Sequence, residues 1–153
     1  MWMHELKDYP ELLAPVIANM REWDRREIFA TLDGDDADLA EAVGGAGPVT
    51  WVAGKGDQPI AVFGCRPMWP GVWSMWFFAT DEIDNIGLAV TKVIKNGIVP
   101  MLFAEGAHRL ECRSMKGHTE AQRWLTVLGA KREGRLKAFG RGREDFYTYV
   151  WTA

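Results

Sequence analysis

The spacing of apolar residues predicts helices in the first third of the 153-residue chain. Apolar side chains recur there at three- and four-residue steps, which is the helical period, at Leu12, Leu13, Val16, Ile17 and Met20. Asp8 and Glu11 precede this stripe with the spacing of a capping box, and Pro15 predicts a kink within it. A second helix is expected over residues 24–29, followed by an acidic, solvated loop over 33–38 and a short helix over 39–43.

From residue 49 the pattern changes to the two-residue period of strands. Strands are expected over 49–53, 59–65 and 71–78, and the turn 54–57 joins the first two as a hairpin. The remaining expected elements are a helix over 86–96 that ends at Gly97, another helical turn from Pro100 to Glu105, a strand over 110–114, a helix from His118, and strands over 130–139 and 145–151. This order predicts one α+β domain, residues 1–153, with a strand–helix–strand crossover inside a mostly antiparallel sheet.

Composition indicates an ordinary globular protein, since 25% of the residues are charged and the net charge is -3. The longest apolar run, 98–103, contains Pro100 and is too short to cross a membrane, and the N-terminus lacks the basic start of a signal peptide. A cytoplasmic protein without a membrane partner is therefore expected. Cys65 and Cys112 lack metal-ligand spacing, so we expect buried free thiols and no metal site.

The most informative segment is the helix that begins at His118. Its apolar residues Ala121, Trp124, Leu125 and Leu128 have the helical period, and Gly129 follows where a helix end requires a positive φ. The string resembles the Asn-x-x-Ala-x-x-Leu-Tyr-x-x-x-Gly-Phe segment of the Gcn5-related N-acetyltransferase (GNAT) family, whose element order is similar over nearly the whole chain. The resemblance implies the GNAT fold, with a mixed, mostly antiparallel central sheet and helices on both faces.

The resemblance also implies acetyl-CoA as acyl donor. The family's pyrophosphate loop, Gln/Arg-x-x-Gly-x-Gly/Ala, resembles Asp84-Asn-Ile-Gly87-Leu-Ala89, in which an acid occupies the first position. Backbone N–H groups at a helix start suit an anion, and those of the strand 73–80 are implied to hold the thioester carbonyl. The residues implied to bind acetyl-CoA are Phe78, Ala79, Thr80, Asn85, Ile86, Gly87, Leu88, Ala89, His118 and Ala121.

Candidate catalytic residues come from the same resemblance. Leu110-Glu111-Cys112-Arg113 is similar to the Leu-Glu-Val-Arg strand of N-terminal acetyltransferases that modify ribosomal proteins, which implies Glu111 as general base. His118 and Glu27 are further candidates. Leu125 stands where the family has its tyrosine acid, which leaves three alternatives: Tyr147, Tyr149 or His118 supplies the proton, the thiolate leaves unassisted, or the protein does not catalyse transfer.

A narrower resemblance concerns bacteriophage proteins. Residues 24–28, 59–64, 123–130 and 145–151 are similar to small phage GNAT-like proteins, including the internal virion protein A family of short-tailed phages. The resemblance implies a phage-encoded N-acetyltransferase, monomeric or homodimeric, that acetylates a lysine or N-terminus of a host or phage protein in the host cytoplasm. The alternative is a catalytically silent virion or assembly protein with this fold.

A basic segment closes the chain. Six cations lie between residues 131 and 143 against a single acid, Glu133; they are Lys131, Arg132, Arg135, Lys137, Arg141 and Arg143. Such a run can contact nucleic acid or an acidic protein surface, or it can be a solvated sheet edge whose charges discourage aggregation. The solvated edge is the expected role, and nucleic acid is not an expected partner.

Overall fold

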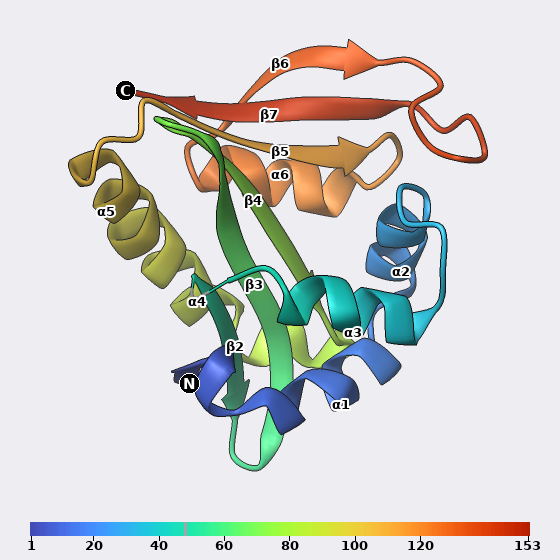
Figure 1. Ribbon diagram of the computed structural model, residues 1–153, viewed down its shortest axis with the longest axis vertical. Coiled ribbons are helices and arrows are strands. Elements are labelled where there is room, and N and C mark those ends of the chain that lie inside the picture. Colours follow the sequence, from blue (N-terminus) through green and yellow to red (C-terminus); the bar gives the residue numbers. More distant parts are fainter. Residues whose placement is uncertain (48) are drawn as a thin grey trace. The chain divides into compact units, whose positions relative to one another are not determined.

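The computed structural model describes residues 1–47 and 49–153, and its strands form one seven-stranded sheet in the order β1-β2-β3-β4-β5-β7-β6 (Figure 1). The strands are β1 Trp2–Glu5, β2 Thr50–Lys55, β3 Gln58–Trp69, β4 Val72–Ala79, β5 Arg109–Met115, β6 Lys131–Leu136 and β7 Phe146–Thr152. β1–β2, β2–β3, β5–β7 and β6–β7 pair antiparallel, whereas β4 and β5 pair parallel. The predicted α+β class and its single crossover before β5 are confirmed.

Helices connect these strands. They are η1 Leu6–Asp8, η2 Pro10–Leu12, α1 Leu13–Ala18, α2 Glu22–Phe29, α3 Asp36–Gly44, η3 Asp81–Asn85, α4 Gly87–Val93, η4 Ile94–Ile98, α5 Val99–Ala104 and α6 Thr119–Val127. The chain forms two compact units, an N-terminal unit of Met1–Arg66 with Met75–Val90 and a C-terminal unit of Pro67–Ser74 with Thr91–Ala153. That both belong to a single domain over residues 1–153 stays a prediction.

The N-terminal unit has an apolar core to which the predicted helical stripe contributes. Val16 and Ile17 of α1 are buried there with Val52 and Phe78 of the strands, and α1 packs beside α3 (Figure 1). The predicted start of the first helix is wrong, because residues 6–12 form two short 3-10 turns and α1 begins only at Leu13. Pro15 consequently lies in the first turn, where a missing N–H removes no helical hydrogen bond.

The capping box of this unit lies at α3 instead of at Asp8. Asp35 accepts hydrogen bonds from the N–H groups of Ala37 (3.0 Å) and Asp38 (3.1 Å), and the Asp38 carboxylate accepts one from the Asp35 N–H (2.8 Å). The acidic segment predicted as a solvated loop therefore supplies the cap and first turn of a helix.

β1 is a strand that the sequence pattern does not predict. It pairs with β2, Trp2 opposite Gly54, and the Trp2 indole N–H donates to the Gly56 carbonyl at 2.9 Å. A Cβ on Gly54 would lie 2.3 Å from the Trp2 ring and 2.1 Å from the Gln58 carbonyl oxygen, so the register requires glycine at this position.

In the C-terminal unit, α6 lies beside β5 and β7 (Figure 1). The Trp151 indole N–H donates to the Leu128 carbonyl (3.0 Å), and that of Trp124 donates to the Thr91 hydroxyl (2.8 Å). Gly129 has a φ of 96°, which confirms the predicted left-handed end of this helix.

The two helical segments predicted before β5 are confirmed but form one continuous helix. Gly97 does not end it but lies inside a π-helical turn, η4, and Pro100 occupies the first turn of α5, so helix continues from Gly87 to Ala104. The expectation that no apolar segment approaches the length of a membrane span is therefore wrong. Among the described residues this 18-residue run, with mean hydropathy 1.3, is the one that meets the length and composition of a membrane span; core helices of globular proteins meet the same test.

Candidate functional site

The predicted pyrophosphate loop is formed by residues at a strand-to-helix connection of the N-terminal unit. β4 ends at Ala79, and the Thr80 hydroxyl then accepts a hydrogen bond from the Glu82 N–H (3.2 Å), which begins η3. The first hydrogen bond of α4 runs from the Val90 N–H to the Ile86 carbonyl (2.9 Å). The N–H groups of Leu88 and Ala89 precede that bond in the first turn, where a helix has its N-terminal positive charge.

Gly87 begins α4 at a position where the fold does not require glycine. Its φ lies outside the left-handed range, and a Cβ built on it would meet no described atom within 4 Å. Neither backbone conformation nor packing in the described part of the chain therefore requires glycine. Open space over a first helical turn does allow a phosphate to approach the backbone, whereas a larger side chain would occupy that space.

Acidic side chains surround the same connection. Asp81, Glu82 and Asp84 are all exposed in η3, and the Asn85 amide donates to the Glu82 carboxylate at 2.7 Å. The stretch 81–90 contains neither lysine nor arginine. The backbone N–H groups of this helix start and the open space above Gly87 thus fit a pyrophosphate. Its negative charge is opposed by three carboxylates, of which the sequence motif indicated only Asp84.

The end of β4 already has hydrogen-bond partners within the unit. The Ala79 N–H donates to Asp24 Oδ2 (2.9 Å), and the Ala79 carbonyl accepts from the Arg21 N–H (2.8 Å). The Thr80 N–H donates to the Ile60 carbonyl (2.9 Å). Within the strand 73–80, which is implied to hold the thioester carbonyl, the N–H groups of Ala79 and Thr80 therefore already donate to protein acceptors.

Asp24 is the buried acid of this arrangement, with 5% of its surface exposed. Arg21 contacts both of its carboxylate oxygens, with Nη2–Oδ1 at 3.0 Å and Nη2–Oδ2 at 2.9 Å, and its Nε adds a bond of 3.1 Å. We call Arg21, Asp24 and Ala79 the β4 clamp. Sequence analysis missed it, although the Arg-x-x-Asp spacing at the start of α2 places the two side chains on one helix face.

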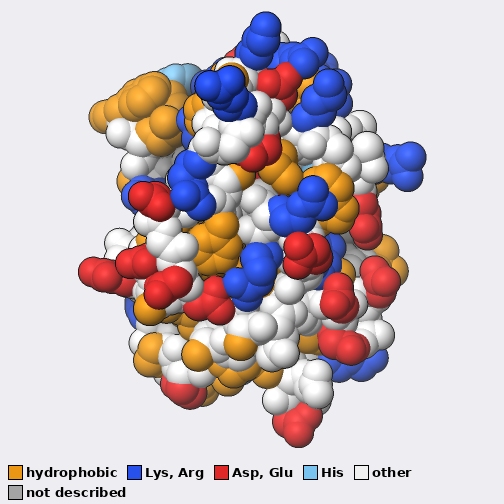
Figure 2. Space-filling model, turned by 90° about the vertical axis from the view of Figure 1, so that its right-hand side faces the viewer, with side chains coloured by type: hydrophobic (Ala, Val, Ile, Leu, Met, Phe, Trp, Pro, Cys, Tyr) orange, Lys and Arg blue, Asp and Glu red, His pale blue; other side chains and the backbone are white. Residues whose placement is uncertain are grey.

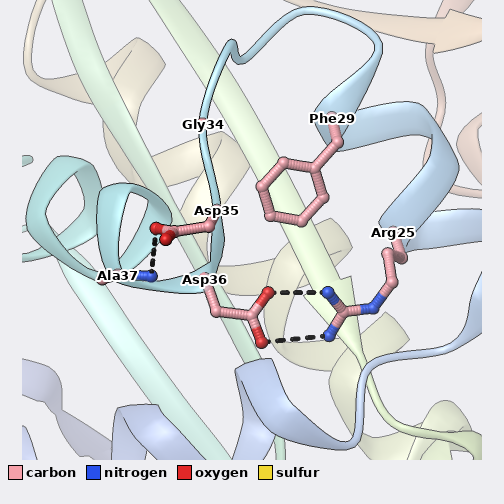
Figure 3. A pocket seen from close by; sticks show the side chains of 6 residues that line it. All are labelled: Arg25, Phe29, Gly34, Asp35, Asp36 and Ala37. Atoms are coloured by element: carbon pink, nitrogen blue, oxygen red, sulfur yellow. Dashed lines mark hydrogen bonds and ion pairs between the residues drawn. The ribbon is translucent and has the colours of Figure 1, made fainter.

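Glu27 lies on α2, half-buried, one turn after Asp24. A hollow of about 400 Å³ opens nearby between α2 and α3, lined by Arg25, Phe29, Gly34, Asp35, Asp36 and Ala37 (Figure 3). Arg25 crosses it to Asp36, with Nη1–Oδ1 at 2.6 Å, and also donates to the Ile17 carbonyl (2.7 Å). The Arg25–Asp36 ion pair within the hollow thus joins α2 to α3. Glu27 is not among the residues that line the hollow.

Glu111 of β5, in the C-terminal unit, is part of an ion-pair network. Its Oε2 accepts from Arg109 Nε (3.0 Å), its Oε1 lies 3.9 Å from Arg113 Nη2, and 16% of its side chain is exposed. Arg109 also makes two bonds of 2.7 Å to Glu133, and these bonds, with those to Glu111, raise the pKa of Arg109 further above its usual value. Glu111 is therefore an ion-paired carboxylate in this structure, with Glu133 as the competing partner of Arg109.

His118 is the residue before α6 and is buried, with 4% exposure, although a helix-start histidine is typically a surface residue. Its carbonyl accepts from the Gln122 N–H (3.2 Å). Gln122 in turn donates to the buried Ser114 (3.5 Å), which places Ser114 on the α6 side of β5. Because successive residues of a strand face opposite ways, Glu111 points away from α6, and the structure does not bring Glu111 and His118 together.

A polar network beside α6 was not predicted from the sequence. The Gln122 amide donates to the Met115 carbonyl (3.0 Å), and Arg132 Nη2 donates to Gln122 Oε1 (3.3 Å) and to the Tyr149 hydroxyl (3.0 Å). The Arg132 guanidinium also lies 3.8 Å from the centroid of the Tyr147 ring. Both tyrosines considered as proton donors are thus in contact with one arginine, a pairing that the register of β6 against β7 produces.

The predicted residues are divided between the two units. Glu27 and the segment from Phe78 to Ala89 belong to the N-terminal unit, whereas Glu111, His118 and Ala121 belong to the C-terminal unit. Cys65 is buried as expected, whereas Cys112 is half-buried, and no disulfide joins the two. Burial raises the pKa of the Cys65 thiol to about 12, which makes it a poor nucleophile at neutral pH.

No family model and no curated protein sequence matches the chain. Solved structures match over nearly its whole length. The ribosomal-protein-alanine N-acetyltransferase from Brucella melitensis has a TM-score of 0.74 at 15% identity, covering 100% of both chains. The ribosomal-protein-S18-alanine N-acetyltransferase from Escherichia coli has a TM-score of 0.65 at 14% identity, covering 99% of this chain and 92% of its own.

A GNAT-family acetyltransferase from Bacillus anthracis is similar as well, with a TM-score of 0.67 at 15% identity over 98% of this chain and 93% of its own. At these identities the likeness concerns the fold. The seven-stranded mixed sheet, the parallel β4–β5 pair and these matches together show that the chain has the GNAT acetyltransferase fold.

Proposed function

We propose that the protein is an acetyl-CoA-dependent N-acetyltransferase that acts on a protein amine, a lysine or an N-terminus. The observation that carries the proposal is Gly87, a glycine that the fold does not require, at a helix start open to an anion in a GNAT fold. Two of the matched structures are enzymes named for acetylating the alanine of ribosomal proteins, which supports a protein N-terminus as acceptor.

The chain's own groups have separate tasks under this proposal. The backbone of Gly87, Leu88 and Ala89 holds the pyrophosphate, and Asn85 and Ile86 shape the approach to it. The resemblance to the GNAT family assigns Phe78, Ala79 and Thr80 to the backbone beside the acyl group, and His118 and Ala121 to the pantetheine arm. Acetyl-CoA, when bound, supplies an acetyl group activated as a thioester.

Glu111 accepts the proton of the acceptor amine in this scheme. Arg109 must then transfer its hydrogen bonds to Glu133, which already receives two of them, so that a Glu111 lone pair becomes available. Glu27 and His118 are the remaining candidates for proton transfer. The thiolate needs little assistance as a leaving group, because a thiol pKa is near 8.5.

The experiment that tests donor binding is thermal unfolding with and without 1 mM CoA. Gly87→Val should abolish the stabilisation that CoA gives, because its side chain fills the approach to the backbone, and Gly97→Val is the matched control, since Gly97 also has open space around a Cβ. Asp84→Gln should increase the stabilisation by removing one like charge. An unchanged midpoint of the wild type at millimolar CoA would contradict the proposal.

A second candidate is a catalytically silent GNAT-fold protein of a phage virion. The observations that favour it are the engagement of the Ala79 N–H by Asp24, the ion pairing of Glu111, and leucine at position 125. The comparisons with solved structures lend no support to a phage-specific subfamily. A phage origin, the host cytoplasm as location, and a monomeric or homodimeric state remain parts of the proposal.

A further inference from the structure

The two units carry charge of opposite sign. The C-terminal unit contains twelve Lys and Arg against six Asp and Glu, whereas the N-terminal unit contains six against fifteen. The net charge of -3 conceals this division. Lys and Arg side chains gather at the top of Figure 2, where β6 and β7 lie in Figure 1.

The loop of residues 137–145, which joins β6 to β7, is held by its own acids. Asp145 accepts a hydrogen bond from the Ala138 N–H (2.8 Å) and pairs with Arg135 of β6. The Glu144 carboxylate accepts from the Gly142 N–H (2.9 Å), and the Glu144 carbonyl accepts from the Gly140 N–H (3.0 Å). Both carboxylates of this loop therefore hold its backbone, and Asp145 also pairs with a cation of β6.

Close contacts and unusual backbone angles fix the conformation of this loop. A Cβ would lie 2.1 Å from the Glu144 carboxylate at Gly140 and 2.3 Å from it at Gly142, so a side chain at either position would displace that carboxylate from the loop. Ala138 and Arg143 have positive φ angles, 52° and 66°, which residues other than glycine seldom adopt. Such conformations persist only where surrounding contacts impose them. The loop is thus preorganised.

What this loop presents to solvent is cationic and aromatic. Lys137, Arg141 and Arg143 are exposed, and so is 41% of Phe139. The Phe139 ring packs edge-on against Phe146 at 5.4 Å, while the Arg113 guanidinium lies 5.1 Å from its centroid. Phe139 is therefore held by Phe146 and by the Arg113 guanidinium, and two-fifths of the residue remains exposed in a segment that carries three exposed cations.

We propose that the loop of residues 137–145 binds single-stranded nucleic acid, with phosphates on Lys137, Arg141 and Arg143 and an unpaired base stacked on Phe139. Proteins hold single strands by combining cations along the sugar–phosphate backbone with aromatic rings on which the bases stack. An acidic protein surface would pair with the same cations, and the possibility of stacking a base on Phe139 is what favours a single strand over it. This binding goes beyond acetyl transfer and does not depend on it.

The test is fluorescence anisotropy with a labelled 20-nucleotide oligouridylate at 50 and 200 mM salt. Three phosphate contacts should weaken binding by about 20-fold between these salt concentrations, because each contact releases condensed counterions. Arg141→Glu with Arg143→Glu should abolish binding. Lys92→Glu with Lys95→Glu, which makes the same charge change at exposed sites of the same unit, should leave binding largely intact.

Phe139→Leu tests the stacking step while keeping an apolar side chain against Phe146. It should weaken binding by about fivefold or more and leave the salt dependence unchanged. The proposal is overturned if the wild type does not bind at 50 mM salt, or if both charge-reversal pairs weaken binding equally. Full binding by Phe139→Leu, or equal binding of polyglutamate, would overturn it in favour of general polyanion attraction.

Discussion

The β4 clamp makes a sharp prediction about stability. Asp24→Ala leaves the Arg21 guanidinium and the Ala79 N–H without their shared acceptor inside the N-terminal unit. Removing one partner of a buried ion pair costs about 3–5 kcal/mol. Arg21 keeps 18% of its side chain exposed, so water can replace part of the interaction and the expected loss is about 3 kcal/mol. For a chain of this length that corresponds to roughly 6–12 °C in Tm.

Urea denaturation of the wild type and Asp24→Ala measures this loss. Asp24→Asn should lose about half as much, because its amide oxygen still accepts the Ala79 N–H while the charge is removed. Asp36→Ala is the matched control: it breaks the Arg25–Asp36 pair, whose acid is 49% exposed, and should cost at most about 1 kcal/mol. If Asp24→Ala costs no more than Asp36→Ala, the clamp does not stabilise the unit and the reasoning is refuted.

Two further predictions concern acids of the C-terminal unit. Glu111→Gln should lower the rate of acetyl transfer by about 10²–10⁴-fold at neutral pH and leave CoA binding unchanged, as measured by steady-state kinetics and calorimetry; an unchanged rate would remove Glu111 from the mechanism. The N–H of Ala138 and the Arg135 side chain lower the pKa of Asp145 below its usual 3.8, so its stabilisation is complete above that value and is lost as pH falls through the lower folded value. The Tm difference between the wild type and Asp145→Asn should therefore shrink below about pH 4, and a difference that is constant from pH 6 to pH 2.5 would contradict this.

Elements with a strong local signal were predictable from the sequence. α6 has an amphipathic period and a glycine that must adopt a left-handed φ, so both its helix and its end were predicted. β1 was missed because its four residues, Trp2–Glu5, do not alternate between apolar and polar side chains. The prediction that the helix ends at Gly97 was wrong, because a π-helical turn accommodates this glycine and the helix continues beyond it.

The helix start at Gly87 was predictable from the sequence, whereas the contacts of the candidate residues were not. The glycine of the Gly87 loop has a sequence signature, and the structure places it at a helix start. Asp24, in contrast, hydrogen-bonds a backbone N–H that lies 55 residues away in the chain, and Glu111 shares Arg109 with Glu133 of a different strand. Such partners depend on strand register, which a single sequence pattern does not determine.

The central claim is that the protein transfers an acetyl group to a protein amine. It is tested most directly by mass spectrometry of a cell lysate incubated with the pure protein and isotope-labelled acetyl-CoA, with Gly87→Val as the comparison. We predict labelled acetyl groups on a lysine or an N-terminus with the wild type and their loss with Gly87→Val. Unlabelled proteins throughout, from a folded wild type that binds CoA, would contradict the claim and favour a silent GNAT-fold protein.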